Sequence, residues 1–135
     1  MTDYKKPLPQ PDVISQTYWT AAKDHKLIIQ SCTGCQQYVF YPREECPYCQ
    51  SKDLEWVEVS GKGSVYSYTI VRRAAHPGFT NDVPYVYAII ELAEGPRLIS
   101  NVIDCNIGEV QIGMPVTVAF EDVTRENTLV KFRPV

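Results

Sequence analysis

The chain has 135 residues and a formal net charge of −3. Proteins that bind nucleic acids normally present a basic face that displaces counterions from phosphates, so this charge argues against that class. No apolar run approaches the roughly 20 residues needed to span a bilayer, and residues 1–6 lack the apolar core of a secretion signal. These features predict a cytoplasmic protein with no membrane segment, whose five cysteines stay reduced and available to a metal ion.

Residues 1–26 are predicted to form an N-terminal arm followed by a short helix. The segment 7–11 holds three alternate prolines, which favour an extended arm because proline fixes φ and removes an amide donor. Ser15 is a candidate N-cap, and the helix is expected to end near Lys23. Its aromatic stripe is expected to pack against the rest of the chain or to anchor an interface.

Residues 27–53 are predicted to form a zinc ribbon around two Cys-x-x-Cys pairs, Cys32/Cys35 and Cys46/Cys49, which ten residues separate. A tetrahedral zinc ion needs four soft donors at about 2.3 Å, and two tight turns facing each other across a hairpin bring four thiolates to one point. Four thiolates leave no open coordination position, so the predicted metal is structural. Iron fits the same ligands, and the sequence does not distinguish the two metals.

Two other uses of these cysteines fit less well. A thioredoxin-like redox motif uses one Cys-x-x-Cys pair at the start of a helix, and the residues after each pair here show no helical pattern. A disulfide framework is unusual for five cysteines in a chain without a signal peptide. The fifth cysteine, Cys105, is expected to be a small buried apolar residue and not a reactive thiol. A metal site is therefore the preferred interpretation.

Residues 54–135 are predicted to form a β-barrel. After a lead-in strand, five segments show a β pattern and are joined by short turns: 65–71, 85–92, 98–103, 116–120 and 128–132. This arrangement favours a five-stranded OB-fold-like barrel. An OB-fold usually has a helix between its third and fourth strands, and 104–113 is too short for one, so a sandwich stays possible. The strand at 85–90 is apolar on both faces, so its outer face is expected to be covered.

These motifs, taken in order, resemble a known family over nearly the whole chain beyond the proline arm. The resemblance is carried by Trp19, residues 27–32, the two cysteine pairs, and the segments 61–69, 72–79 and 112–116. The family is the acyl-CoA-associated proteins, which join a rubredoxin-like zinc ribbon to an OB-fold. The resemblance implies a mainly β chain with a short N-terminal helix, such a ribbon and a five-stranded barrel.

Members of this family accompany thiolase-like enzymes, including thiolases, acyltransferases and aldolases that act on CoA thioesters. The resemblance therefore implies a hetero-oligomer whose large partner supplies the catalytic Cys and His. This chain would be a non-catalytic, zinc-binding accessory subunit that supports assembly and helps to hold the CoA thioester.

The connection at 72–83, between the first two predicted barrel strands, supplies candidates for contact with CoA or with the partner. These are Arg72, Arg73, His76 and Phe79. Cations suit the phosphates of CoA, and an aromatic ring beside them suits its adenine. Loops carry binding residues disproportionately often, although arginines at a strand end are also commonly just solvated.

Two other functions stay open on the sequence alone. A zinc-ribbon and OB-fold module could bind single-stranded nucleic acid, with tyrosines as stacking platforms, and would then bind oligonucleotides in a salt-dependent way. A rubredoxin-like electron carrier would hold iron in the same four thiolates, and would be red and reversibly reducible by one electron.

Overall fold

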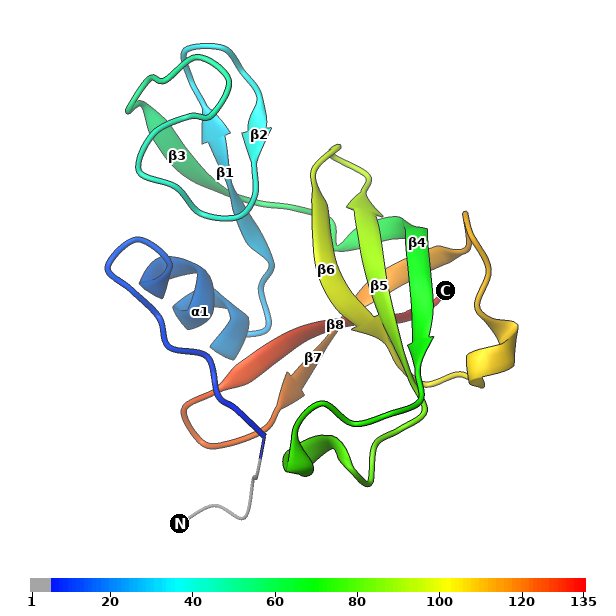
Figure 1. Cartoon of the computed structure of the whole chain (residues 1–135). Coiled ribbons are helices and arrows are strands. Elements are labelled where there is room, and N and C mark those ends of the chain that lie inside the picture. Colours follow the sequence, from blue (N-terminus) through cyan, green and yellow to red (C-terminus); the bar gives the residue numbers. More distant parts are fainter. Residues whose placement is uncertain (1–5) are drawn as a thin grey trace.

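The computed structural model describes residues 6–135, in which a helix and a small sheet lie beside a β-barrel (Figure 1). The helix α1 comprises Gln16–Lys23, and the small sheet contains β1 Ile28–Cys32, β2 Tyr38–Val39 and β3 Leu54–Glu58. The barrel strands are β4 Lys62–Val71, β5 Tyr85–Leu92, β6 Arg97–Val102, β7 Pro115–Asp122 and β8 Thr128–Pro134. Two 3₁₀ helices, η1 Pro77–Phe79 and η2 Ile107–Glu109, lie in the barrel's longer connections.

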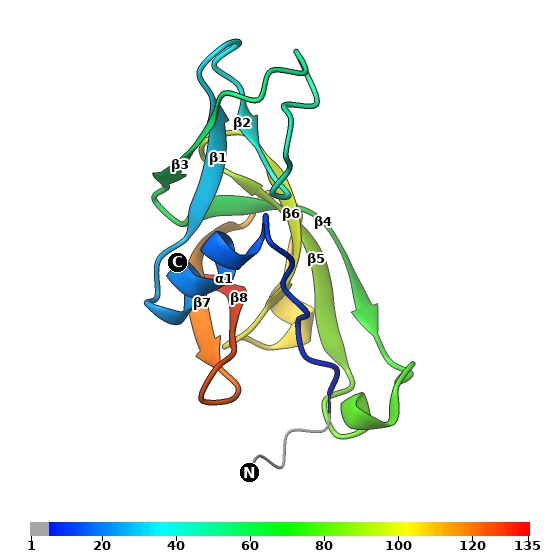
Figure 2. The same ribbon diagram turned by 90° about the vertical axis from the view of Figure 1, so that its left-hand side faces the viewer.

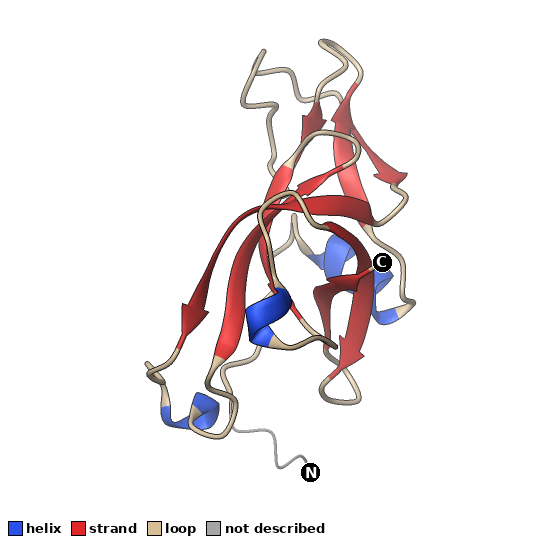
Figure 3. Cartoon of the chain, turned by 90° about the vertical axis from the view of Figure 1, so that its right-hand side faces the viewer, coloured by secondary structure: helices blue, strands red, loops and turns tan. Residues whose placement is uncertain are grey.

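The five barrel strands close in the order β4-β5-β6-β8-β7, with β7 returning to β4. All neighbours are antiparallel except β6 and β8, which are parallel. This is the Greek-key order of a five-stranded OB-fold barrel, so the predicted fold is confirmed and the alternative sandwich is wrong. In place of the usual helix between the third and fourth strands, the chain has only the three-residue η2 (Figure 3).

The barrel core follows the period-two alternation of its strands. In β5, Val86, Ala88 and Ile90 are buried, whereas Tyr87 between them is exposed. β5 therefore directs every second side chain inward, and β6 shows the same alternation. Phe132 of β8 is the largest fully buried side chain and lies in the same cluster.

Two glycines allow β4 to start in the crowded gap between β5 and β7. Gly61 has a φ of +78°, and a Cβ there would lie 2.4 Å from Val118 Cγ1. A Cβ on Gly63 would lie 2.5 Å from the carbonyl oxygen of Glu91. The glycine pair therefore permits a close backbone approach that no larger residue could make without a shift.

The small sheet has the order β2-β1-β3 and forms the ribbon. Pairing of β1 with β2 covers only two residues, whereas β3 pairs with β1 from Ile28↔Glu58 to Cys32↔Leu54. The segment from residue 54 onward was predicted to begin the barrel region. The structure instead places β3 in the ribbon, on the side of β1 opposite β2. There β3 provides hydrogen-bond partners for the backbone amides and carbonyls of β1 that β2 does not reach.

The start of α1 differs from the prediction in its side-chain hydrogen bonds. Asp12 Oδ1 accepts a hydrogen bond from Ser15 N–H (2.7 Å), and Ser15 Oγ accepts one from Asp12 N–H (3.0 Å). The helical bonding also begins earlier, with Gln16 N–H donating to the Asp12 carbonyl (3.0 Å). Ser15 is thus the N-cap position of α1, as predicted, but its side chain makes no capping hydrogen bond to the helix and pairs with Asp12 in a reciprocal arrangement like a capping box.

The helix joins the ribbon to the barrel. Tyr18 is buried in one cluster with Leu27 and Ile29 of the ribbon and with the barrel core. Just after α1, the His25 ring stacks on Phe120 of β7, and its Nε2 lies 3.0 Å from the Asp122 carboxylate. Within residues 6–135 no helix is both long and apolar enough to cross a membrane.

Candidate metal centre and the surfaces around it

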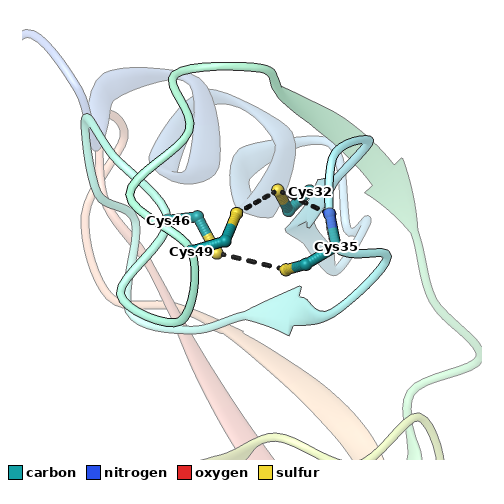
Figure 4. Close-up of side chains that lie close together, drawn as sticks. All are labelled: Cys32, Cys35, Cys46 and Cys49. Carbon is teal, nitrogen blue, oxygen red and sulfur yellow. Dashed lines mark hydrogen bonds between the residues drawn. The ribbon is translucent and has the colours of Figure 1, made fainter.

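The four predicted ligand cysteines converge on one point at the tip of the ribbon (Figure 4). Cys32 Sγ lies 3.5 Å from Cys49 Sγ, and Cys35 Sγ lies 3.5 Å from Cys46 Sγ. All four sulfurs lie within 4.8 Å of one another. A zinc ion with Zn–S bonds of about 2.3 Å needs sulfurs about 3.8 Å apart, so the four donors fit a tetrahedral ion.

Two similar turns hold the cysteine pairs. In each turn the residue after the second cysteine donates its N–H to the carbonyl of the first, from Gln36 to Cys32 and from Gln50 to Cys46, both at 2.8 Å. Gln36 and Gln50 also share a left-handed backbone, with φ of 63° and 65°. The repeated geometry is typical of a ribbon in which two equivalent turns grip one ion.

Backbone amides directed at the sulfurs favour their thiolate forms. The Cys35 N–H lies 3.5 Å from Cys32 Sγ and lowers the pKa of that thiol to about 7. Tyr48 N–H lies 3.4 Å from Cys46 Sγ. Thiolate is the form that binds a metal. The pKa values of Cys35 and Cys49 are instead raised, by burial and by the neighbouring cysteine sulfurs, so two of the four sulfurs favour the thiolate in the protein alone. With all four positions filled by protein sulfur, zinc bound here would act as a structural ion.

A buried glutamine supports the loop between the two turns. Gln30 donates from Nε2 to the Arg43 carbonyl (2.8 Å), and its Oε1 accepts from Arg43 N–H (2.7 Å). This pair of hydrogen bonds holds the segment that follows Phe40 and Tyr41 against β1. Our sequence reasoning missed Gln30. The available signal was a polar side chain ending an otherwise apolar run, Leu27 to Ile29.

Of the four CoA candidates, the structure brings His76 and Phe79 into contact, with ring centroids 6.2 Å apart. Arg72 and Arg73 are exposed and make no hydrogen bond or ion pair with any part of the described chain. His76 Nδ1 instead accepts the Gly78 N–H (2.9 Å) and caps η1. Phe79 packs on Tyr85 with ring centroids 5.8 Å apart. This loop and the cysteine turns lie at opposite ends of the molecule (Figure 1).

Cys105 lies beside a cavity of about 350 Å³ that Phe79 also lines. Burial raises the pKa of the Cys105 thiol, and the nearby carboxylates of Glu109 and Asp104 raise it further. A raised pKa disfavours the nucleophilic thiolate. The side chain also packs against the barrel core.

A larger, mostly apolar groove of about 560 Å³ lies where the helix, the ribbon and the barrel meet. We call it the junction groove. Tyr18 and Trp19 of α1 and Phe40 and Tyr41 of the ribbon loop line one wall, and residues of β5, β6 and β8 line the other. Because three segments far apart in sequence build it, no local motif predicts it.

Comparison with known proteins places these features in a family. Residues 19–55 match the family model of the ChsH2 rubredoxin-like zinc ribbon domain, and residues 56–121 match that of the ChsH2 C-terminal OB-fold domain. A DUF35 domain-containing scaffold protein of Methanocaldococcus jannaschii is 38% identical over 111 residues, covering 81% of this chain and 78% of the relative. The chain belongs to the ChsH2/DUF35 family. The predicted family resemblance is confirmed.

Two further relatives of this DUF35 chain differ in length. It is 38% identical over 129 residues to a probable enoyl-CoA hydratase alpha subunit of Thermomonospora curvata, covering 96% of this chain but only 40% of that relative. It matches a chain of the solved Ltp2-ChsH2(DUF35) aldolase at 38% identity and a TM-score of 0.84, covering 93% of this chain and 98% of that one. A DUF35-family structure from Sulfolobus solfataricus, 18% identical with a TM-score of 0.63, shows the fold alone.

Proposed function

We propose that the chain is a zinc-stabilised, non-catalytic subunit of a cytoplasmic complex in which a thiolase-like enzyme acts on CoA thioesters. The observation that carries this proposal is the match to the Ltp2-ChsH2(DUF35) aldolase chain, which extends over almost the full length of both chains. The names of other relatives, a scaffold protein and a hydratase alpha subunit, agree with a role inside an assembly.

The described side chains support a non-catalytic role. A catalytic histidine needs a nucleophile or a reacting atom within hydrogen-bond reach. Among residues 6–135, His25 bonds Asp122 and His76 bonds its own loop, and neither ring makes a hydrogen bond to a Ser, Thr or Cys side chain. With Cys105 kept as a thiol, the reactive groups of the proposed complex belong to the partner.

The zinc ion would act through the ribbon. Apart from the core it shares with the barrel, the ribbon has a separate buried cluster of only Cys32, Val39 and Cys46. Metal binding contributes on the order of 10–16 kcal/mol in small zinc modules, which is enough to fold such a unit. The folded ribbon then presents Phe40 and Tyr41 to the junction groove.

CoA binding is the finer part of the proposal and involves the 72–79 loop. Arg72 and Arg73 are exposed and unpaired within the described chain, so both guanidinium groups are available to phosphate oxygens. Replacing both with Ala should weaken CoA binding to the complex by about tenfold, by isothermal titration, if each contact contributes a modest charge-assisted bond. Unchanged affinity would remove CoA binding from the role of this loop.

The assembly itself is tested by co-expressing the chain with a thiolase-like enzyme from the same organism. We expect the two proteins to co-purify with one zinc ion per chain, and the purified chain alone to show no turnover of acyl-CoA. Robust turnover by the single chain would refute the non-catalytic role. A red, reversibly reducible preparation would instead identify an electron carrier.

A further inference from the structure

The strands β6 and β8 close the barrel, but they pair with each other at one position only, and we call the gap between them the seam. The strands pair at Val102↔Phe132, and Ile103 N–H donates to the Phe132 carbonyl (2.8 Å). On its other side, β6 pairs with β5 along its whole length, from Arg97 to Val102. From Asn101 back to Arg97, β6 therefore has no paired strand on its β8 side within residues 6–135 (Figures 1 and 2).

A side chain shows how the seam opens. The Val130 carbonyl of β8 accepts a hydrogen bond from Ser100 Oγ (2.8 Å). In a continuous ladder a backbone N–H of the neighbouring strand would occupy this place. The hydroxyl satisfies β8 here, so the strands are already too far apart for backbone pairing.

The free edge of β6 presents the backbone of Ile99. Successive residues of a strand direct their N–H and C=O groups to alternate sides. Ile103 donates toward β8, so Asn101 and Ile99, two and four residues before it, face the same side. The N–H and C=O of Ile99 thus point into the seam and not toward β5.

Apolar side chains surround this edge. Ile99 is 61% exposed and Tyr87 is 44% exposed on the barrel side of the junction groove. Across the groove, the Tyr18 ring lies 5.6 Å from Phe40 and 6.2 Å from Tyr41, forming an aromatic wall. The groove therefore combines a hydrogen-bonding strand edge with apolar surface on either side.

The charges at the rim of the groove are already neutralised. Arg97 Nε lies 3.0 Å from Glu91 Oε2, and the Arg97 guanidinium lies over the Tyr66 ring at 3.7 Å from its centroid. Lys131 Nζ lies 3.2 Å from Glu121 Oε1. Neither cation is free for a phosphate, so the groove suits an uncharged apolar occupant better than a nucleic acid strand.

We infer that an extended segment of the partner enzyme enters the junction groove as an added strand beside β6, bonding the Ile99 backbone and packing alternate apolar side chains on the aromatic wall. This inference rests on the proposed function, since it assigns the docking surface of the proposed partner. Added strands gain affinity from main-chain hydrogen bonds and specificity from pockets for alternate side chains. A docked helix would bury the Ile99 N–H without an acceptor, which is unfavourable.

The test uses the full chain in complex with the co-expressed thiolase-like enzyme. Ile99→Pro removes the N–H that faces the seam and leaves the β5 ladder bonds in place. We expect the dissociation constant to rise at least about tenfold. Ile99→Asp, which places a charge in the apolar groove, should raise it at least about 30-fold. Ile112→Asp is the matched control, since Ile112 is 64% exposed and lies outside the groove, and should change it less than about threefold.

Hydrogen exchange on the wild-type complex gives a second reading that does not depend on the variants folding. The Ile99 amide should exchange at least about tenfold more slowly in the complex than in the free chain. An unchanged exchange rate of the Ile99 amide, or an unchanged dissociation constant in the Ile99→Asp variant, overturns the inference and leaves the proposed function intact. Failure of the wild-type chain to bind the enzyme removes both. A homodimer that Ile99→Asp dissociates would identify a second copy as the occupant and refute an enzyme segment.

Discussion

The ribbon and the barrel are stabilised by different chemistry. In the ribbon's own cluster, two of three buried residues, Cys32 and Cys46, are metal ligands. The barrel instead has a continuous apolar core that includes Val86, Ile90 and Phe132. The difference teaches that one 135-residue chain can depend on an ion at one end and on hydrophobic burial at the other. The two regions should therefore fail under different perturbations.

Removing a metal ligand should have the largest effect and should separate the regions. Cys46→Ser removes one of four sulfur donors, in a type of module where metal binding contributes about 10–16 kcal/mol. We expect amides of β1 and β2 to exchange with solvent at least about 100-fold faster, while amides of β5 keep their protection. Hydrogen–deuterium exchange with mass spectrometry measures both. Cys105→Ser, at the fifth cysteine, should leave zinc content unchanged, and loss of β5 protection together with β1 would contradict the separation.

Truncating the barrel core should give the converse result. Phe132→Ala removes the largest fully buried side chain and should lower the free energy of unfolding by about 3–5 kcal/mol in urea titrations. Zinc stoichiometry of the folded fraction should not change, because Phe132 lies outside the cysteine cluster. Ile112→Ala, at an exposed position, should cost less than about 0.5 kcal/mol. Zinc loss in folded Phe132→Ala would show that the two regions are not separable.

A pair of glycines tests whether barrel closure limits stability. A Cβ on Gly63 would lie 2.5 Å from the Glu91 carbonyl oxygen, a backbone atom, so Gly63→Ala should cost about 1–3 kcal/mol by chemical denaturation. A Cβ on Gly108 would meet no atom within 4 Å. Gly108→Ala is thus the matched substitution and should change stability by less than about 0.5 kcal/mol. An equal loss of unfolding free energy in both variants would mean that the backbone entropy of glycine, and not steric crowding at Gly63, determines the effect.

The smallest effect concerns the contact between the helix end and β7. The Thr128 hydroxyl and then the His25 ring hold the pKa of Asp122 below its ordinary value of 3.8. A depressed folded-state pKa adds stability above pH 3.8, and this stability is lost as the pH falls through the folded value. Asp122→Asn should therefore lower the urea midpoint slightly at neutral pH, with a difference from wild type that shrinks in acid. A difference that grows in acid would reverse the assigned sign.

The metal cluster and the strands were predictable because local sequence determines them. Two Cys-x-x-Cys turns set the relative positions of Cys32, Cys35, Cys46 and Cys49, and the period-two pattern marks each barrel strand. The outer face of β5 was expected to be covered, whereas Tyr87 on that face is 44% exposed in this chain. Pairing between distant segments was not predictable in the same way, because β3 could join either sheet on its own pattern.

Side chains that act across the fold escaped prediction for the same reason. Gln30 reads as an ordinary strand residue until Arg43 is placed beside it. Within the helix start, Asp12 and Ser15 are both good capping residues, and only the structure shows that each side chain bonds the other's backbone N–H. The junction groove needs Trp19, Tyr41 and Ile99 brought together from three segments.

The link between β3 and β4 has a consequence for how an incoming segment is received. It is short, and both ends are tied: Val59 N–H donates to the Leu27 carbonyl (3.0 Å), and the Gly61 carbonyl accepts from Val118 N–H (2.8 Å). A link fixed at both ends does not allow the ribbon to rotate relative to the barrel. The width of the junction groove is therefore set before binding. A partner segment that fits this width would bind without the entropic cost of ordering two domains.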